Sequence, residues 1–508
     1  ASPTKTALRP SLIHGSVLPP ISAPAHLSRR VRLEDGTIHD PVLAGLKKTG
    51  KIPPYMDPKL IKAAVNDVLR IHQTNDRTRK RVLTNLEALS GVVDDPYSNP
   101  LNRGSSPGYP WIKTRVGKGK MKWTSDPQGE YKMHVELEKA IEERETMALN
   151  NERYPTVWID TLKDERRPLE KVRVGKTRVF AAGPMDFIVC ARKYFLGFCA
   201  HLAENRINNE VAVGINPYSF DWTHLARHLQ KFGINVVAGD FGNFDGTLIL
   251  QILEEIGEMI NEWYDDGEEN RQIRRILWKE LINSVHIEGN NLYFWTHGHP
   301  SGHPLTAILN SLYNSVVCRI VFVLCARKAG KFVTMKDFND NVSMISYGDD
   351  NVLNISERVV DYFNQHSMSE CFAEIGMEYT DELKSSAADA KAFRKLEEVS
   401  FLKRKFRWDE ERQCYTAPLD YSVCMEMVNW IRGELDPEEA CCTNCQTSAM
   451  ELSLHGKEVF EHSTKMIKSA CLTHMIRQPM ILTYDEYIET FENSYGQLME
   501  NSNLELRA

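Results

Sequence analysis

The sequence predicts an α+β protein whose main body is one continuous unit rather than a string of separate domains. From about Met56 onward, helical and strand-like hydrophobic patterns alternate without a clear linker. Strand patterns fade after about Arg407, and residues 449–475 and 484–500 have helical spacing. The first 60 residues hold nine of the 23 prolines, which predicts an extended, loop-rich arm.

The composition is that of a globular protein with a large core: 508 residues, 42% hydrophobic and 26% charged. No run of roughly 18 apolar residues and no apolar h-region near the start are present, so neither a membrane span nor a signal peptide is expected. Eleven cysteines without regular spacing favour reduced thiols and an intracellular location. A net charge of −7 disfavours a nucleic-acid partner unless a local basic patch exists.

Such a patch occurs in KDERRPLEKVRVGKTR, residues 163–178. Lys171 and Arg173 alternate with valines, which predicts a strand with one basic face. Arginine grips phosphate through two parallel hydrogen bonds, so this face suits a triphosphate channel. The alternative is a solvated charged surface. The seven cations, opposed only by Asp164, Glu165 and Glu170, are Lys163, Arg166, Arg167, Lys171, Arg173, Lys176 and Arg178.

The segment INVVAGDFGNFD, residues 234–245, carries two acids. Residues 234–238 have a buried-strand pattern, and Asp240 is expected at the end of that strand. Asp245 follows five residues later, before a helix predicted from the spacing of Leu248, Ile252, Ile256 and Ile260. One interpretation makes Asp245 a helix N-cap and Asp240 a loop acid, and the other makes both of them site residues.

The segment PSGHPLTAILNSLYN, residues 300–314, predicts a flexible Ser301-Gly302 loop followed by a helix that Pro304 opens. Thr306 and Asn310 are four residues apart and therefore share one helix face. They are either ordinary polar positions or part of a ribose site. A ribose 2′-OH both donates and accepts, so Asn310 and Asp245 together suit it.

The segment SYGDDN, residues 346–351, lies between two apolar, alternating runs and predicts a hairpin over 342–355. Gly348 tolerates the positive φ of a tight turn. Asp and Asn are common turn residues, so a solvated turn is one interpretation of Asp349 and Asp350. If Asp240 lies beside them, three carboxylates converge, and clustered carboxylates require a cation. Oxygen ligands select Mg²⁺ or Mn²⁺, and two such ions stabilise a phosphoryl transfer.

With these four segments in this order, the chain resembles a viral RNA-dependent RNA polymerase of the picornavirus-like superfamily, with dicistrovirus-like or iflavirus-like features in KDERRP and SGHPLTAILN. The matching pattern is D-x4-D, SG-x3-T-x3-N and YGDD after the basic segment. Three further segments are similar to the family: SSPGYP (105–110) to the loop where the template enters, GMEYTDELK ending at Lys384 to the segment of the proton-donating lysine, and FLKRKF (401–406) to the primer-grip hairpin.

The resemblance implies a cupped right hand of fingers, palm and thumb, with an antiparallel palm sheet of RNA-recognition-motif-like topology. Its implied parts are an N-terminal arm and fingers (1–194), the first part of the palm (195–275), a fingers insertion (276–299), the second part of the palm with the primer-grip hairpin (300–406) and a helical thumb (407–508). The N-terminal arm would bridge fingers and thumb.

The resemblance also implies residue roles. Asp240 and Asp349, assisted by Asp350, would hold two Mg²⁺ ions, for which Mn²⁺ can substitute, and Lys384 would protonate pyrophosphate. The remaining roles divide by ligand. Triphosphate is assigned to Lys163, Arg167, Lys171, Lys176 and Arg178; ribose to Asp245, Ser301, Gly302, Thr306 and Asn310; template and primer to Ser105, Ser106, Gly108, Lys403 and Arg404.

The implied function is template-directed RNA synthesis, transferring NMP from NTP to an RNA 3′-OH, in replication of a positive-strand RNA virus genome. Expected partners are RNA template and primer, NTPs, a small genome-linked protein primer and other viral replication proteins. The expected location is the host cytoplasm, at membrane-associated replication complexes. A reverse transcriptase and a catalytically idle RNA-binding scaffold remain the alternatives. Cys441–Cys445, without a second Cys/His pair at zinc-finger spacing, are expected to be ordinary thumb cysteines.

Overall fold

The computed structural model describes residues 5–433 and 435–493. Its central sheet is antiparallel throughout and has the strand order β11-β12-β8-β13. In chain order, helices separate β8 from β11 and β12 from β13, so the sheet has the β-α-β-β-α-β arrangement of ferredoxin-like and RNA-recognition folds. The four strands are β8 (Val236–Gly242), β11 (Val342–Tyr347), β12 (Asp350–Ile355) and β13 (Glu378–Asp381).

The predicted hairpin forms at β11 and β12. Tyr347 pairs with Asp350, which leaves Gly348 and Asp349 as a two-residue loop. Gly348 has φ +61°, the left-handed conformation that glycine adopts without a Cβ clash. Both faces of the hairpin strands are buried, rather than one. This double burial explains why the sequence is apolar at nearly every position.

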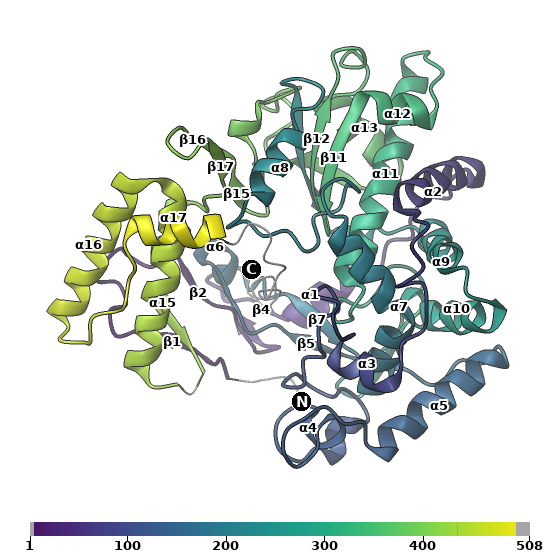
Figure 1. Ribbon diagram of the computed structural model, residues 1–508, viewed down its shortest axis with the longest axis horizontal. Coiled ribbons are helices and arrows are strands. Elements are labelled where there is room, and N and C mark those ends of the chain that lie inside the picture. Colours follow the sequence, from purple (N-terminus) through teal and green to yellow (C-terminus); the bar gives the residue numbers. More distant parts are fainter. Residues whose placement is uncertain (1–4, 434, 494–508) are drawn as a thin grey trace.

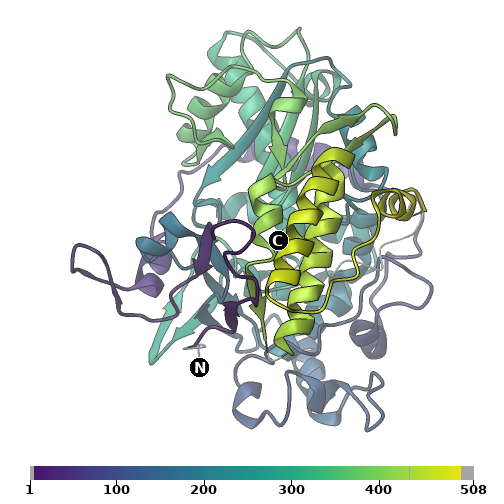
Figure 2. The ribbon, with the colours of Figure 1, turned by 90° about the vertical axis from the view of Figure 1, so that its left-hand side faces the viewer.

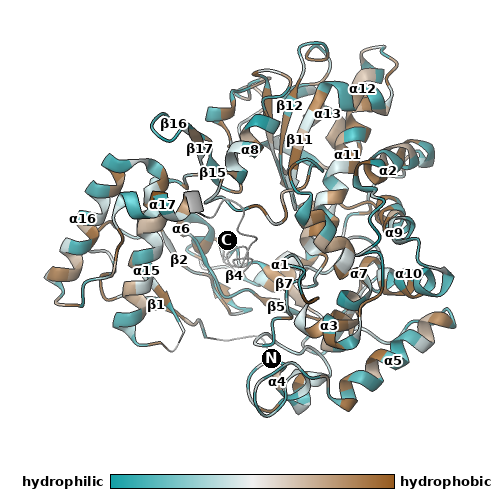
Figure 3. Ribbon diagram, in the orientation of Figure 1, coloured by the Kyte–Doolittle hydropathy of each residue, from teal (hydrophilic) through white to brown (hydrophobic). Residues whose placement is uncertain are grey.

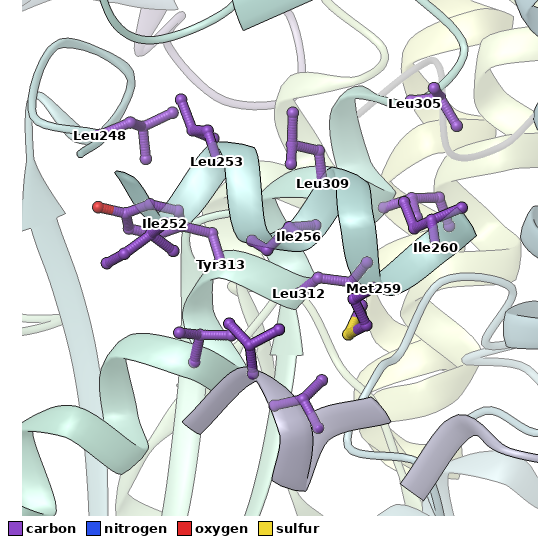
Figure 4. Packing of buried hydrophobic residues seen from close by; sticks show 14 of the residues in the cluster. Leu248, Ile252, Leu253, Ile256, Met259, Ile260, Leu305, Leu309, Leu312 and Tyr313 are labelled. Carbon is purple, nitrogen blue, oxygen red and sulfur yellow. The ribbon is translucent and has the colours of Figure 1, made fainter. Parts of the chain in front are cut away.

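Four helices cover one side of this sheet: α2 (Pro58–His72), α9 (Leu250–Tyr264), α11 (Thr306–Lys328) and α13 (Gln365–Glu374). Ile256 of α9 lies next to Leu309 and Leu312 of α11, and all three are fully buried (Figure 4). Burying each such side chain contributes about 1.5–3 kcal/mol, so this contact rigidly sets the spacing of the two helices.

The helix α11 is long and apolar enough to cross a membrane by length and composition alone. However, 94% of its apolar window is buried against the rest of the chain, as expected for the core helix of a globular fold. Figure 3 shows α11 among the other helices that cover the central sheet.

A second sheet has the order β10-β9-β5-β7. It joins β5 (Val157–Leu162) and β7 (Val179–Ala182) to β9 (Val285–Glu288) and β10 (Asn291–Phe294), so residues 276–299 lie against residues of the N-terminal part. The associated helices are α3 (Asn85–Ser90), α4 (Met121–Thr124), α5 (Val135–Leu149), α7 (Met185–Glu204) and α10 (Glu268–Ile282), with the 3-10 turn η1 (Trp111–Thr114).

The C-terminal part is mainly helical, as predicted, and lies at the left of the view in Figure 1, across the molecule from α9 and α10. Strands persist beyond Arg407, contrary to expectation, as β16 (Arg407–Asp409), β17 (Cys414–Thr416) and β18 (Trp430–Arg432). The helices are α14 (Tyr421–Glu426), α15 (Pro437–Leu452), α16 (Lys457–Thr473) and α17 (Tyr484–Asn493), with η4 (Ser453–His455). The predicted helical spacing over 494–500 lies outside the described residues.

The N-terminal arm connects the two sides of the molecule. Its strand β1 (Leu8–Pro10) pairs with β18, and β2 (Ser22–Pro24) pairs with β6 (Arg166–Pro168). Figure 2 shows this purple segment beside the yellow-green helices of the C-terminal part. The arm then forms the small pair β3 (Val31–Arg32) and β4 (Ile38–His39) and the helix α1 (Pro41–Lys47).

Candidate active site

The first acid, Asp240, lies within β8 rather than at its end, because the strand continues to Gly242. Ile234, expected to be buried, is 68% exposed and precedes the strand. Asn351 pairs with Gly239, so the same register places Asp350 next to Asp240 across the sheet. Burial raises the pKa of Asp240 above its ordinary value, although Lys384 opposes this shift from 3.6 Å.

The second and third acids sit in the β11–β12 turn. Burial, with repulsion from Asp245 and Asp240, raises the pKa of Asp349 to about 6, even though part of the residue faces solvent. Burial, with repulsion from Asp349 and Asp240, raises the pKa of Asp350 to about 8. The register of β12 on β8 places Asp350 beside Asp240, and Asp349 directly precedes Asp350, so the acids from the two segments lie close together, as the sequence led us to expect.

The described residues contain no group of three or more His, Cys, Asp or Glu side chains already arranged to hold a metal ion. Two of the three carboxylates already have positive or N–H partners within the protein. Asp350 Oδ2 accepts the Leu402 N–H at 2.8 Å, and the Lys384 ammonium lies 3.6 Å from Asp240 Oδ2. The donor set nevertheless fits a hard divalent cation, because it is all oxygen and its charged form is disfavoured without a positive partner. The Lys384 ammonium is the positive group that lies beside Asp240.

Four buried polar residues that the sequence analysis missed support the acidic turn. The Ser311 hydroxyl accepts the Gly348 N–H at 2.9 Å, and the Asn314 amide donates to the Gly348 carbonyl at 3.1 Å. The Asn351 amide donates to Asn314 at 2.8 Å and accepts the Tyr379 hydroxyl proton at 2.8 Å. Helix α11 therefore holds the turn through hydrogen bonds, and the four-residue spacing of Asn310 and Asn314 was the available signal.

The basic segment does not form the predicted strand. Residues 166–168 form β6, and Lys171 and Arg173 instead lie in the short helix α6 (Leu169–Arg173). A period-2 pattern over four residues is too short to exclude one helical turn, and the preceding proline favours a helix start. The cations of the segment therefore lie on β6, on a turn of helix and in the loops beside them, not on one strand.

One cation of this segment, Arg178, nonetheless reaches the acids, and several of the others lie close to one another. Arg178 forms a bidentate ion pair with Glu165 and also interacts electrostatically with Asp349. Burial, with Arg178 nearby, lowers the pKa of Lys163. Repulsion from Lys176, burial and repulsion from Lys384 lower the pKa of Lys171. Burial and Arg178 also lower the pKa of Arg167. Because clustered positive side chains repel one another, a polyanionic ligand such as a triphosphate would bind them favourably.

The two predicted sugar-reading residues meet. Asp245 lies in the 3-10 turn η2 (Phe244–Gly246) after Asn243, which has φ +53°. It is not a helix N-cap, because α9 begins at Leu250 with Ile249 at that position. The Asn310 amide donates to Asp245 Oδ1 at 3.4 Å, and Asp245 is exposed whereas Asn310 is 7% exposed.

The other residues of that motif hold the loop to the second sheet. Ser301 Oγ accepts the Ala181 N–H at 3.1 Å, and Gly302 bridges to Ala182. A Cβ on Gly302 would lie 1.9 Å from the Ala181 carbonyl oxygen, so only glycine fits. The Thr306 hydroxyl lies 3.0 Å from the carbonyl oxygens of both Ser301 and His303. Its hydrogen bonding is therefore directed to the loop backbone.

The two nucleic-acid segments differ in accessibility. Ser105 and Ser106 are exposed on a loop that Gly108, with φ +70°, brings against Gly183. Lys403 is exposed at the turn between β14 (Ser400–Phe401) and β15 (Arg404–Lys405). Arg404, also assigned to template and primer, is largely buried. Its guanidinium pairs with Glu451 of α15 at 2.8 Å.

The thumb cysteines are buried rather than arranged around a metal. Cys441, Cys442 and Cys445 lie on α15, and Cys441 and Cys445 belong to the apolar core of that region. All eleven cysteines are free.

A buried Ser–His–Asp chain in the second sheet cannot serve as a nucleophilic site. Ser284 Oγ lies 2.7 Å from His286 Nε2, and His286 Nδ1 lies 2.9 Å from Asp160. Ser284 is 1% exposed and His286 is fully buried under Trp295, so no substrate reaches the hydroxyl.

Comparisons with known proteins agree with this geometry. Residues 19–472 match the sequence family described as viral RNA-dependent RNA polymerase. The replicase polyprotein of Acute bee paralysis virus (strain Rothamsted) is 43% identical over 502 residues, covering 97% of this chain and 26% of that polyprotein. That of Cricket paralysis virus is 43% identical over 505 residues, covering 95% and 28%. The chain thus spans about a quarter of the length of these curated relatives.

The fold is similar to that of a solved structure, the Sicinivirus 3Dpol RNA dependent RNA polymerase. The TM-score is 0.81 with 21% sequence identity, covering 97% of this chain and 96% of the other. The predicted α+β right-hand fold is thereby confirmed.

Proposed function

Because the chain belongs to the viral RNA-dependent RNA polymerase family, we propose that it copies an RNA template by transferring NMP from NTP to an RNA 3′-OH. The predicted family resemblance, with its dicistrovirus-like features, is confirmed, and the enzyme class is an RNA-directed RNA polymerase. The observation that carries the proposed reaction is the meeting of Asp240 with the Asp349–Asp350 turn across the central sheet.

Divalent metal dependence is general for this family, and we infer that Mg²⁺ is the natural ion, with Mn²⁺ as a substitute. Asp240 and Asp349 would hold it, with Asp350 as the weaker partner because its carboxylate already accepts the Leu402 N–H. When bound, the ions would acidify the primer 3′-OH and neutralise phosphate charge.

The basic segment would bind the triphosphate. The assigned residues are Lys163, Arg167, Lys171, Lys176 and Arg178. Among them, Arg178 interacts electrostatically with the catalytic acid Asp349. Its ion pair with Glu165 keeps the guanidinium oriented while half of the side chain stays exposed at 52%. The position supports a role in carrying phosphate to the acids rather than in binding RNA.

Lys384 would act as the general acid. Its ammonium is 68% exposed and lies 3.6 Å from Asp240, so it reaches the reaction centre from the solvent side. Release from Asp240 would free it to donate a proton to the leaving pyrophosphate.

Asp245 and Asn310 would read the ribose 2′-OH, which favours ribonucleotides and disfavours the reverse-transcriptase alternative. The exposed Asp245 carboxylate can accept a hydrogen bond from the 2′-OH, while the Asn310 amide holds that carboxylate by donating to its Oδ1. Ser301, Gly302 and Thr306 would act indirectly, by fixing the loop on which Asn310 depends.

The remaining assignments are also part of this proposal. The division into arm and fingers (1–194), palm (195–275 and 300–406), fingers insertion (276–299) and thumb (407–508) is supported by the two sheets and the C-terminal helices. RNA template and primer, a small genome-linked protein primer and other viral replication proteins would be the partners. The site of action would be the host cytoplasm, at membrane-associated complexes, in replication of a positive-strand genome.

Primer extension on a homopolymeric RNA template tests the function, with rNTPs or dNTPs and with Mg²⁺ or Mn²⁺. We expect metal-dependent incorporation of rNTPs. Asp349→Asn should abolish incorporation while a filter or fluorescence assay still detects RNA binding. Asp361→Asn, an exposed acid away from the site, is the matched control and should retain activity. Full activity of Asp349→Asn would refute the metal assignment, and preferred use of dNTPs would favour the reverse transcriptase. RNA binding without any incorporation by the unmutated chain would favour the scaffold.

A further inference from the structure

Two buried histidines stand behind Asn310. His299 Nε2 lies 2.6 Å from Asn310 Oδ1, and His299 Nδ1 lies 2.8 Å from His303 Nε2. His299 is 1% exposed and His303 is 8% exposed. These contacts extend the hydrogen bond between Asn310 and Asp245 into the interior. Neither histidine belongs to the motif pattern that the sequence analysis used.

The direction of this chain of hydrogen bonds follows from one backbone group. The Leu305 N–H donates to His303 Nδ1 at 3.1 Å, and a backbone amide cannot exchange donor for acceptor. His303 Nδ1 therefore carries no proton and acts as the acceptor. Burial and the nearby His299 hold the pKa of His303 well below its ordinary value, so the ring is neutral and carries its one proton on Nε2.

The remaining protons are then determined in turn. His303 Nε2–H donates to His299 Nδ1, so the proton of His299 lies on Nε2 and points at Asn310. The Pro300 carbonyl, 3.1 Å from His299 Nδ1, competes for the opposite tautomer, but that tautomer would leave the proton of His303 without its acceptor. Asn310 must present its carbonyl oxygen to His299, which turns its NH₂ group toward Asp245.

The same loop also contacts the other half of the pair. Gly298 has φ +80°, and a Cβ there would lie 2.8 Å from the Asp245 carbonyl oxygen. Residues 298–303 therefore touch the backbone of Asp245 and the side chain of Asn310 together. Asp245 precedes α9 in the chain, and the 298–303 loop precedes α11. The packing of α9 on α11 therefore helps to set the distance between Asp245 and this loop (Figure 4).

We propose that His299, oriented by His303, is a positioning residue for sugar selection: it locks the Asn310 amide so that its NH₂ group restrains Asp245 for the ribose 2′-OH. This inference rests on the proposed sugar-reading role of Asp245 and Asn310. Without the lock, the amide can rotate by 180° and place its carbonyl oxygen against the Asp245 carboxylate, which repels it. Discrimination against deoxynucleotides then falls, while the acids of the reaction centre stay in place.

The test compares His299→Met, which keeps side-chain volume without a donor, with His299→Gln, whose amide can still donate to Asn310. Single-nucleotide incorporation gives kcat and KM for a matched rNTP and dNTP, and their kcat/KM ratio is the readout. We expect His299→Met to lower the ratio by roughly tenfold, the effect of about 1.4 kcal/mol, mainly through the KM for the rNTP. His299→Gln should restore most of it. In an Asn310→Ala background, His299→Met should cause no further loss.

Three comparisons separate the possible outcomes. His201→Leu, a buried histidine on α7, controls for loss of stability and should leave the ratio unchanged. If His299→Met does not fold, His303→Met is the second test, because it removes the hydrogen bond that orients His299. It should lower the ratio by a smaller factor. An unchanged ratio in whichever of these variants folds, with a lowered ratio in Asn310→Ala, overturns the positioning role. An unchanged ratio in Asn310→Ala overturns the sugar-reading proposal itself.

Discussion

Replacing Tyr379 by Phe removes one hydrogen bond behind the acidic turn. The Tyr379 hydroxyl donates to Asn351 Oδ1 at 2.8 Å, and the two residues are 2% and 0% exposed. Burial raises the pKa of Tyr379 well above its ordinary value, so the phenol keeps its proton and remains a donor. The variant leaves a buried carbonyl oxygen without this donor, which costs about 1–3 kcal/mol of unfolding free energy.

The thermal effect follows from the size of the chain. If all 508 residues unfold together, the unfolding entropy is about 1.1 kcal/mol/K, taking about 2.1 cal/mol/K per residue. The loss then lowers Tm by about 1–3 °C in differential scanning calorimetry. Primer extension should also slow, because Asn351 restrains Asn314, which holds the Gly348 carbonyl.

A matched control and a double-mutant cycle make this result decisive. The Tyr415 hydroxyl accepts an exposed hydrogen bond from Gln230, so Tyr415→Phe should change stability by less than about 0.5 kcal/mol. Tyr379→Phe and Asn351→Ala should be coupled, because they share one hydrogen bond. Zero coupling, or a Tm equal to that of the unmutated protein, would refute the reasoning.

Three further predictions concern chemistry, packing and acid stability. Lys384→Leu should slow single-turnover incorporation by roughly 10²-fold or more, with a modest change in NTP affinity, and an unchanged rate counts against a general acid. Gly239→Ala places a Cβ about 1.9 Å from the Tyr379 ring, so it should destabilise by about 1–3 kcal/mol or more; a Tm within error of the unmutated protein contradicts this packing. Arg319 lowers the pKa of Asp67 below 3.8 against the effect of burial, so their pair stabilises the fold above that pH and is lost as pH falls through the lower folded value. Asp67→Asn should therefore lower Tm at pH 6 but flatten its fall toward pH 3, and parallel Tm curves would exclude the linkage.

The parts of the site with local signals were predictable from the sequence. The hairpin over 342–355 follows from alternating apolar residues and Gly348, and the structure contains it. The helix with Thr306 and Asn310 on one face follows from four-residue spacing, and it also forms. Such patterns succeed because hydrogen bonding and burial over a few residues decide the local conformation.

The parts that depend on distant contacts were not predictable in this way. The Asp350 carboxylate accepts from Leu402, 52 residues away, and no spacing rule indicates that contact. Nothing in the sequence indicated that Arg404 pairs with Glu451 of α15, 47 residues away, where both side chains are largely buried. The helix at Lys171 was mistaken for a strand because four residues satisfy both periods.

The N-terminal arm pairs with two separate parts of the chain. β1 pairs with β18 in the C-terminal part, and β2 pairs with β6 in the basic segment. A motion that separates these two parts must first break one of the two ladders, so the arm couples them mechanically. The backbone ladders of the arm therefore act as two ties between parts of the chain that lie more than a hundred residues apart in sequence.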